Sequence, residues 1–317
     1  MVKIFKNVKR LKLKITSMVL LVALLMLEFS PFAVKATAQQ LQYYSPGVVS
    51  VGYDAGNGKN VWYSRATLGG DVAYCIDYTC PAPSGTMTFR SYLSDQGMAI
   101  LMNGYPNNSP AALGCDNEDE AYMATQMALW EVMNRTGESQ KSGLIFRVEN
   151  VTPKAGKQDF YNKSVAAAKR LVAMAEANPY TTVPTMVIDN SQAGLSYLGN
   201  DALIGPYTVT IEGTQSAIVK SITASLTNAP ASARITDANG NEKTALSSGD
   251  SVYVRMSSSE DSKTFKIKFT TDIDRKVGAI YTKPGETVQD YVKIETEPNT
   301  AERELTIEWE KVTTLGK

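Results

Sequence analysis

Apolar positions recur at three- and four-residue spacing between Glu118 and Arg135, and this pattern predicts one amphipathic helix. The expected apolar stripe consists of Tyr122, Leu129, Trp130 and Met133. Asp116 and Asn117 can each cap the N-terminus of the helix, and three acidic residues follow them where the helix dipole favours negative charge. Gln126 lies within the stripe, one turn from Tyr122 and one turn from Trp130. A primary amide there needs a partner or a reaction, because an unpaired buried amide costs about 1–3 kcal/mol.

The segment from residue 39 to about residue 200 mixes helices and strands. Further helices are expected at Ser94–Asn103 and Gln158–Asn178, because each helical pattern stops at a turn that contains glycine or proline. Strands are expected at Val48–Tyr53, Val61–Thr67, Val72–Tyr78 and Thr181–Ile188. Within the third of these strands, the alternation of side chains puts Cys75 in mid-strand, on the less apolar face.

From about residue 205 the helical period disappears and short β-rich runs replace it. The runs are Tyr207–Ile211, Val219–Leu226, Ala233–Thr236, Val252–Met256, Phe265–Phe269, Gly278–Thr282, Asp290–Thr296 and Leu305–Trp309. Asp237–Gly240 is suited to a hairpin turn. Runs at this spacing are typical of a β-sandwich. We therefore expect an α+β domain at residues 39–203, followed by an all-β immunoglobulin-like sandwich at residues 204–317.

Residues 1–38 have the three parts of a secretory signal peptide. A basic segment ends at Lys14, an apolar run covers Met18–Leu27, and small residues precede Gln39. The apolar run is too short for a membrane anchor, which takes about 20 residues. The full chain has a net charge of zero, but residues 1–38 hold seven basic side chains and one acidic side chain. Cleavage would leave an acidic mature protein, which argues against a nucleic-acid partner.

The chain contains no His and only three Cys. The lack of His excludes a Ser-His-Asp triad, a Cys-His dyad and a His-ligated zinc, and three Cys cannot form a four-thiolate metal site. An odd number of Cys in an exported protein requires an explanation. Either Cys80 and Cys115 form a disulfide, which would contribute about 4 kcal/mol by closing a loop of about 36 residues, or both stay reduced and buried. Cys75 is left over in either case.

Two short motifs resemble a known family. Tyr74–Asp77 has the sequence YCID, and Thr125–Trp130 has the sequence TQMALW. Together they resemble the paired signatures of thioester domains in Gram-positive surface adhesins, the TQXA-type or Cys-Gln thioester-forming proteins. The resemblance implies that the side chains of Cys75 and Gln126 are joined by a thioester. Three further segments match: Gly104-Tyr105-Pro106, Gly205–Val209 at the opening of the first sandwich strand, and Gln289-Asp290 before a late strand.

The chemistry of such a pair makes physical demands on the fold. A thiolate that attacks a glutamine carboxamide releases ammonia and leaves an acyl–sulfur bond. The reaction needs a fixed near-attack geometry, which can supply effective concentrations of roughly 10⁵–10⁸ M, and it needs water to be excluded. Aromatic residues such as Tyr74, Tyr122 and Trp130 are suited to exclude water.

The residues expected to support the crosslink are Tyr74, Asp77, Thr125 and Trp130. Asp77 could assist proton transfer, although a solvated strand residue is the simpler interpretation of its position. The alternative for the pair itself is that Gln126 is a hydrogen-bonded helix residue and that Cys75 is a small buried thiol.

The resemblance implies an exported, cell-surface adhesin that captures a host or matrix protein when an amine or hydroxyl opens the thioester. Capture of this kind is stoichiometric, so no enzyme, cofactor or metal is expected. The alternative is a non-covalent surface or pilus-tip subunit whose thioester is unformed or decayed, with cell-wall or pilus subunits as partners. No spacing singles out a Lys–Asn isopeptide pair in the sandwich. No LPxTG-like motif follows Trp309, so a truncated sequence and attachment through a partner both stay open.

Overall fold

The computed structural model describes residues 38–44, 49–139, 141–180, 184–213 and 218–311. Residues from Ala38 onward form one compact unit. The expected signal peptide lies almost entirely outside the described residues. Within those residues, no helix is long and apolar enough to cross a membrane.

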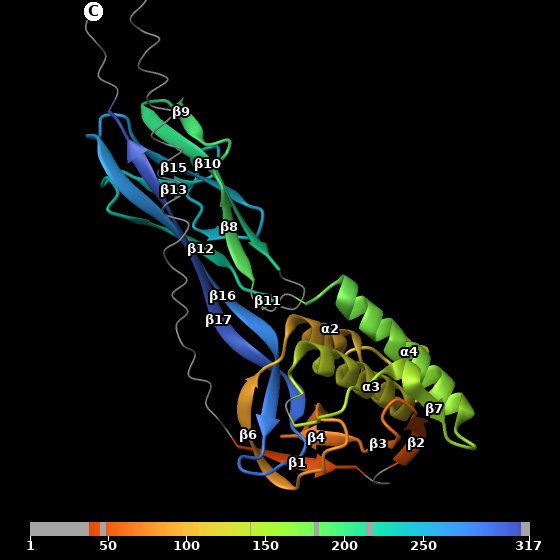
Figure 1. Ribbon diagram of the computed structural model, residues 1–317. Helices are drawn as coiled ribbons and strands as arrows, with labels where there is room; N and C mark the ends of the chain where they lie inside the picture. The colour runs from red at the N-terminus through yellow and green to blue at the C-terminus, as the bar shows by residue number, and fades with distance from the viewer. Residues whose placement is uncertain (1–37, 45–48, 140, 181–183, 214–217, 312–317) are drawn as a thin grey trace, which may run out of the picture. The chain divides into compact units, whose positions relative to one another are not determined.

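Three helices lie close to the predicted positions (Figure 1): α2 (Asp95–Asn103), α3 (Glu118–Thr136) and α4 (Gln158–Ala177). Asn117 caps α3 by accepting a hydrogen bond from the backbone N–H of Glu120 at 3.0 Å. The predicted apolar stripe was too narrow, because α3 is buried on every side from Glu120 to Trp130. It packs against α2, α4 and the strand that carries Cys75, and a helix covered on all sides needs no polar face.

Six strands close into a small barrel in the order β1-β4-β5-β17-β16-β6, with β6 pairing back to β1. They are β1 (Gln39–Tyr43), β4 (Ala66–Leu68), β5 (Asp71–Cys75), β6 (Gly85–Tyr92), β16 (Lys263–Thr282) and β17 (Tyr291–Trp309). A second small sheet contains β2 (Val49–Asp54), β3 (Lys59–Tyr63) and β7 (Val151–Pro153). The expected strand Val61–Thr67 is therefore divided between two sheets, and the expected strand Val72–Tyr78 ends at Cys75 instead of continuing.

A second hydrophobic core lies between two β-sheets. One sheet consists of β11 (Ile218–Val219), β12 (Ile222–Thr227), β14 (Ala245–Leu246) and parts of β16 and β17. The other consists of β8 (Thr185–Asp189), β9 (Gly194–Leu198), β10 (Asp201–Glu212), β13 (Arg234–Thr236) and β15 (Ser251–Ser257). The predicted α+β domain followed by a β-sandwich is confirmed. Gly205-Pro206 lies inside β10, at a shift in its register, rather than at the start of a strand.

The long antiparallel ribbon of β16 and β17 belongs to both cores. It pairs without interruption from Lys263 opposite Trp309 to Tyr281 opposite Tyr291, so four predicted short strands are two long ones. Phe265, Ile267 and Phe269 pack in the sandwich core, whereas Ala279, Ile280, Tyr281, Tyr291 and Val292 pack in the core that contains the helices. Core membership therefore does not follow the predicted division after residue 203.

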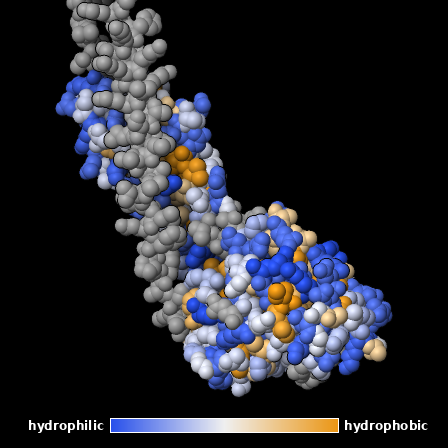
Figure 2. Space-filling model, viewed as in Figure 1, coloured by the Kyte–Doolittle hydropathy of each residue, from blue (hydrophilic) through white to orange (hydrophobic). Residues whose placement is uncertain are grey.

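The surface is mostly polar. In Figure 2 the visible described residues are largely hydrophilic, with small separate hydrophobic patches. This distribution is expected when the apolar side chains of the barrel, the helices and the sandwich are turned into the two cores. Among the described residues, the buried polar residues of the sandwich are Thr236 and Thr271.

Candidate functional site

The end of strand β5 leaves the backbone of Cys75 without a strand neighbour on one side. β4 pairs with β5 only from Leu68 to Ala66, which lies opposite Ala73. Gln126 of α3 occupies the open position beside Cys75. Its Oε1 accepts from the N–H of Cys75 at 3.1 Å, and its Nε2 donates to the carbonyl of Cys75 at 2.5 Å. The carboxamide thus takes the place of a missing peptide group, and it lies against the residue whose thiol would attack it.

One row of α3 makes three successive contacts with the end of β5. The hydroxyl of Tyr122 donates to the carbonyl of Ala73 at 2.7 Å, and Gln126 binds the backbone of Cys75. Trp130 donates its indole N–H to the Sγ atom of Cys75 at 3.2 Å. Residues four apart share a helix face, so a single face of α3 positions the carboxamide and the sulfur together.

The paired residues are almost completely shielded from water. Cys75 is 5 % exposed and Gln126 is 2 % exposed. Burial raises the pKa of the Cys75 thiol far above its usual range, and the hydrogen bond from Trp130 opposes this effect. The thiol is therefore neutral in this environment, and the Cys75 N–H is aimed at the oxygen on which negative charge develops during acyl transfer.

Aromatic side chains surround the pair on two sides. Trp130 packs against Phe146 with ring centroids 5.3 Å apart and against Tyr78 at 5.0 Å. On the other side Tyr74 stacks on Tyr122 at 4.5 Å, and its hydroxyl donates to the carbonyl of Tyr105 at 2.5 Å. These rings exclude water and leave few rotamers available to Trp130.

Thr125 does not face Cys75. Its hydroxyl donates to the carbonyl of Ala121 at 3.0 Å and accepts from the N–H of Tyr105 at 3.0 Å. A Cβ atom on Gly104 would lie 2.6 Å from that hydroxyl, which explains why a glycine precedes Tyr105. Thr125 therefore fixes the turn that carries Tyr105, which in turn holds Tyr74.

Replacing Thr125 with valine is expected to lower the free energy of unfolding by about 1–3 kcal/mol, because the shape is kept while the Tyr105 N–H loses its acceptor. Denaturant unfolding measures this change. Thr125→Ser keeps the hydroxyl and should cost clearly less; equal losses in the two variants would show that the hydroxyl is not the cause.

Asp77 is fully buried, so its interpretation as a solvated strand residue was wrong. Its Oδ1 accepts from the backbone N–H of Lys141 at 3.0 Å and from Ser139 Oγ at 3.3 Å, and its Oδ2 accepts from the N–H of Asp290 at 2.8 Å. The carboxylate binds these groups, whereas Asp77 meets the Cys75 sulfur through its backbone carbonyl, at 3.8 Å. Asp77 connects β5 to the segment after α3 and to the start of β17.

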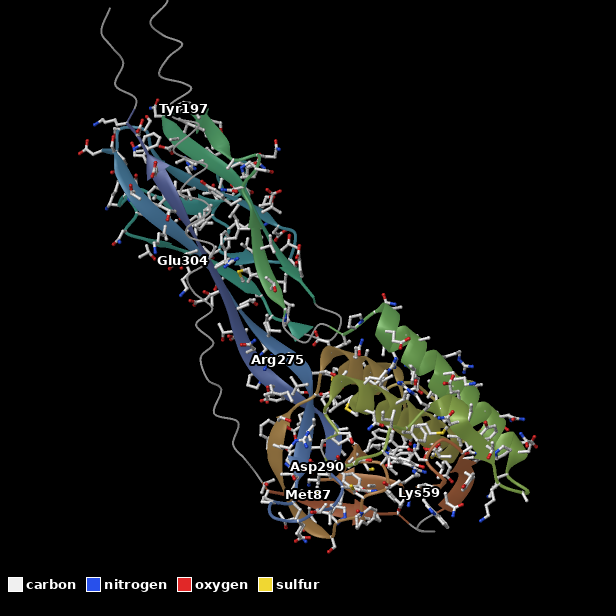
Figure 3. All side chains as sticks on the ribbon, viewed as in Figure 1. Lys59, Met87, Tyr197, Arg275, Asp290 and Glu304 are labelled. Carbon is white, nitrogen blue, oxygen red and sulfur yellow. The ribbon has the colours of Figure 1, made fainter. Side chains whose placement is uncertain are left out.

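Asp290 is the second buried carboxylate of this network (Figure 3). Its Oδ1 accepts from Lys141 Nζ at 2.6 Å, and its Oδ2 pairs with Arg90 of β6. Lys141 Nζ also donates to the hydroxyl of Thr282 at 3.0 Å. Two acidic and two basic side chains thus tie β5, β6, β16, β17 and the segment after α3 together, directly beside Cys75.

The cysteines are all free thiols in the structure, so of the two alternatives for Cys80 and Cys115 the structure has the reduced one, with Cys115 buried and Cys80 half-buried. Cys115 lies before the N-terminus of α3, where burial raises the pKa of its thiol to about 11. The pKa of the Cys80 thiol is raised by burial and by Asp77 and lowered by Lys141, which follows the C-terminus of α3. Cys115 and Cys80 thus lie near opposite ends of α3, which has 19 residues and is about 28 Å long. A disulfide needs Cα atoms within about 7 Å, so these two cysteines are too far apart to be joined.

Sequence reasoning missed most of the surroundings of the pair. No motif marked the five residues that complete these surroundings, which come from four separate segments: Tyr78, Arg90, Lys141 with Phe146, and Tyr291. Asp290 was noted only as part of a family resemblance. Among the described residues, no group of three or more His, Cys, Asp or Glu side chains could hold a metal ion.

Residues 72–177 match the family model of the thioester domain. The matched segment includes β5, α3 and the contact between Cys75 and Gln126. The chain therefore contains a thioester domain. No curated protein matches the sequence.

Two solved structures are similar to most of this chain. "The Bacillus anthracis TIE protein" is 22 % identical with a TM-score of 0.68, and the match covers 86 % of this chain and 49 % of that chain. "Thioester domain of the Enterococcus faecium TIE86 protein" is 18 % identical with a TM-score of 0.64, and the match covers 88 % of this chain and 98 % of that chain. The chain thus spans about half the length of the Bacillus anthracis protein. At these identities the similarity shows a shared fold.

Proposed function

We propose that Cys75 and Gln126 form an internal thioester. We propose further that this protein is an exported cell-surface adhesin, which uses the bond to capture a host or matrix protein covalently. The observation that carries the proposal is the fixed position of the Gln126 carboxamide between the N–H and the carbonyl of Cys75. The thioester-domain match and the basic, apolar and small-residue pattern of residues 1–38 support the same function.

Formation of the bond needs no group from outside the site. The Cys75 sulfur attacks the carboxamide carbon of Gln126, and the Cys75 N–H stabilises the oxyanion of the tetrahedral intermediate. The carbon–nitrogen bond breaks, the thiol proton passes to the departing nitrogen, and ammonia leaves. The closed aromatic surroundings then protect the acyl–sulfur bond from water.

Opening of the bond transfers the acyl group to the partner. A primary amine attacks the same carbon, the carbon–sulfur bond breaks, and a proton of the amine passes to Cys75. The Trp130 N–H, 3.2 Å from the sulfur, stabilises the departing thiolate. An amide through Gln126 remains, together with a free thiol. Each protein molecule reacts once, so the activity is stoichiometric capture and not enzymatic turnover.

Incubation with biotin-cadaverine, a tagged primary amine, tests the function. We expect one biotin per molecule, resistant to denaturation and located on the peptide that contains Gln126. The alternative function, a non-covalent surface or pilus-tip subunit, predicts no denaturation-resistant label and unchanged partner binding after Cys75→Ala. The fixed carboxamide favours the covalent function, because both of its hydrogen bonds hold it against the residue whose thiol would attack it.

A further inference from the structure

Two tyrosines that are distant in the sequence meet beside Cys75. Tyr291 lies directly opposite Cys75 in the antiparallel pairing of β17 with β5, so the two side chains share one side of the sheet. Tyr43 lies opposite Ala66, which lies opposite Ala73, two positions from Cys75 on the same side. Because both intervening residues are alanines, the ring of Tyr43 can extend across β4 and β5 toward Tyr291.

The two rings pack edge to face over these alanines. Their centroids are 6.2 Å apart at an interplanar angle of 73°, and the hydroxyls are 3.2 Å apart. The Tyr43 hydroxyl donates to the carbonyl of Pro83 at 2.8 Å, and the Tyr291 hydroxyl lies 3.0 Å from Gln289 Oε1. Burial raises the pKa of Tyr43 to about 12, and the nearby Cys75 thiol contributes to the increase. The Tyr43 side chain is thus held by two hydrogen bonds, one donated to Pro83 and one accepted from Tyr291, and by one ring contact.

Exposure distinguishes Tyr43 from the other aromatic residues around Cys75. Tyr74, Tyr122, Trp130 and Tyr291 are each at most 4 % exposed, whereas Tyr43 is 37 % exposed. Of the two tyrosines that meet beside Cys75, Tyr43 is therefore the one that reaches the solvent. A partly exposed ring can change its rotamer without disturbing the core.

We propose that Tyr43 is a gate that controls access to the Cys75–Gln126 pair and selects slender, unbranched primary amines such as a lysine side chain. The selectivity rests on the proposed function, because the gated bond is the thioester. When the ring swings away from Tyr291 and Pro83, an amine reaches the acyl carbon, the carbon–nitrogen bond forms, the carbon–sulfur bond breaks, and the proton passes to Cys75. Tyr291 stays buried as the inner wall.

The selectivity is tested by measuring adduct formation with methylamine and with tert-butylamine in wild type, Tyr43→Phe and Tyr43→Ala. Loss of the hydrogen bonds to Pro83 and Tyr291 should speed methylamine addition about threefold in Tyr43→Phe. Loss of the ring should speed it about tenfold or more in Tyr43→Ala. The ratio of methylamine to tert-butylamine rates should fall in Tyr43→Ala, which a general loss of stability would not produce. An unchanged ratio and unchanged rates would overturn the proposal.

Tyr92 supplies a matched control, because it is 38 % exposed and its hydroxyl donates to Glu297 Oε1 at 2.5 Å. Tyr92→Phe and Tyr92→Ala should leave both rates at the wild-type value. If the Tyr92 variants accelerate amine addition as much as the Tyr43 variants do, Tyr43 does not control access to the pair.

A second measurement tests the gate without a thioester. In a Gln126→Ala background no acyl–sulfur bond can form, and iodoacetamide alkylation of Cys75, followed by peptide mapping, reports access to the thiol. Adding Tyr43→Ala should raise the rate of Cys75 alkylation about tenfold, whereas adding Tyr92→Ala should leave that rate unchanged. An equal alkylation rate with and without Tyr43→Ala would contradict the proposed gate, even if the thioester exists. A tenfold rise together with no thioester in wild type would keep the gate and reject the proposed function.

Discussion

Replacing Cys75 with alanine is expected to abolish covalent amine capture completely while the fold is kept. The sulfur is the attacking atom, and it belongs to the residue whose backbone N–H and carbonyl hold the Gln126 carboxamide. The adduct yield with a primary amine should fall from one per molecule to none. Alanine fills most of the volume of a cysteine, so the fold should lose no more than about 1–3 kcal/mol of stability.

The control for this variant is Cys115→Ala, because Cys115 has the same 5 % exposure but lies before the N-terminus of α3. It should retain full amine capture. Gln126→Ala should lose capture as completely as Cys75→Ala, since each removes one side of the same bond. Residual capture in either variant would mean that another group forms the adduct.

Replacing Asp290 with alanine is expected to cost about 3 kcal/mol of stability, because it leaves the charges of Arg90 and Lys141 beside an empty position. The same change should slow formation of the thioester. The backbone of Asp290 donates to Asp77 and accepts from Ile76, so its movement displaces the end of β5. Denaturant unfolding measures the first effect, and the fraction of crosslinked protein by mass measures the second.

Asp261 provides the comparison for Asp290. Its carboxylate also pairs with a lysine, Lys311, at 3.0 Å, but its side chain is 96 % exposed. Asp261→Ala should change stability by less than about 1 kcal/mol, as is usual for surface ion pairs. Similar losses in the two variants would show that burial of the network does not matter.

The sequence was sufficient to predict the helices and the contact between Cys75 and Gln126. Helix α3 was predictable because its cap and the row Tyr122, Gln126 and Trp130 are local features with a helical period. The sandwich was predictable because alternating runs such as Val252–Met256 have a period of two. Both signals are contained within short windows, where periodicity determines which face is buried.

The surroundings of the pair were not predictable, because they come from distant parts of the chain. The alternating pattern around Asp77 is the same for an exposed and a buried carboxylate, and its partners lie 62 to 213 residues away. Tyr291 and Asp290 lie in what the sequence indicated as the sandwich, yet β17 continues into the barrel and puts them beside Cys75. The local period of a strand does not reveal which sheet it extends.

Intact-mass measurement of the purified wild-type protein, under denaturing conditions, tests the central claim most directly. If Cys75 and Gln126 form a thioester, the mass is lower than the sequence mass of the mature chain by one ammonia, and Cys75→Ala restores the full value. A wild-type protein at full sequence mass, with Cys75 open to alkylation after denaturation, would contradict the claim.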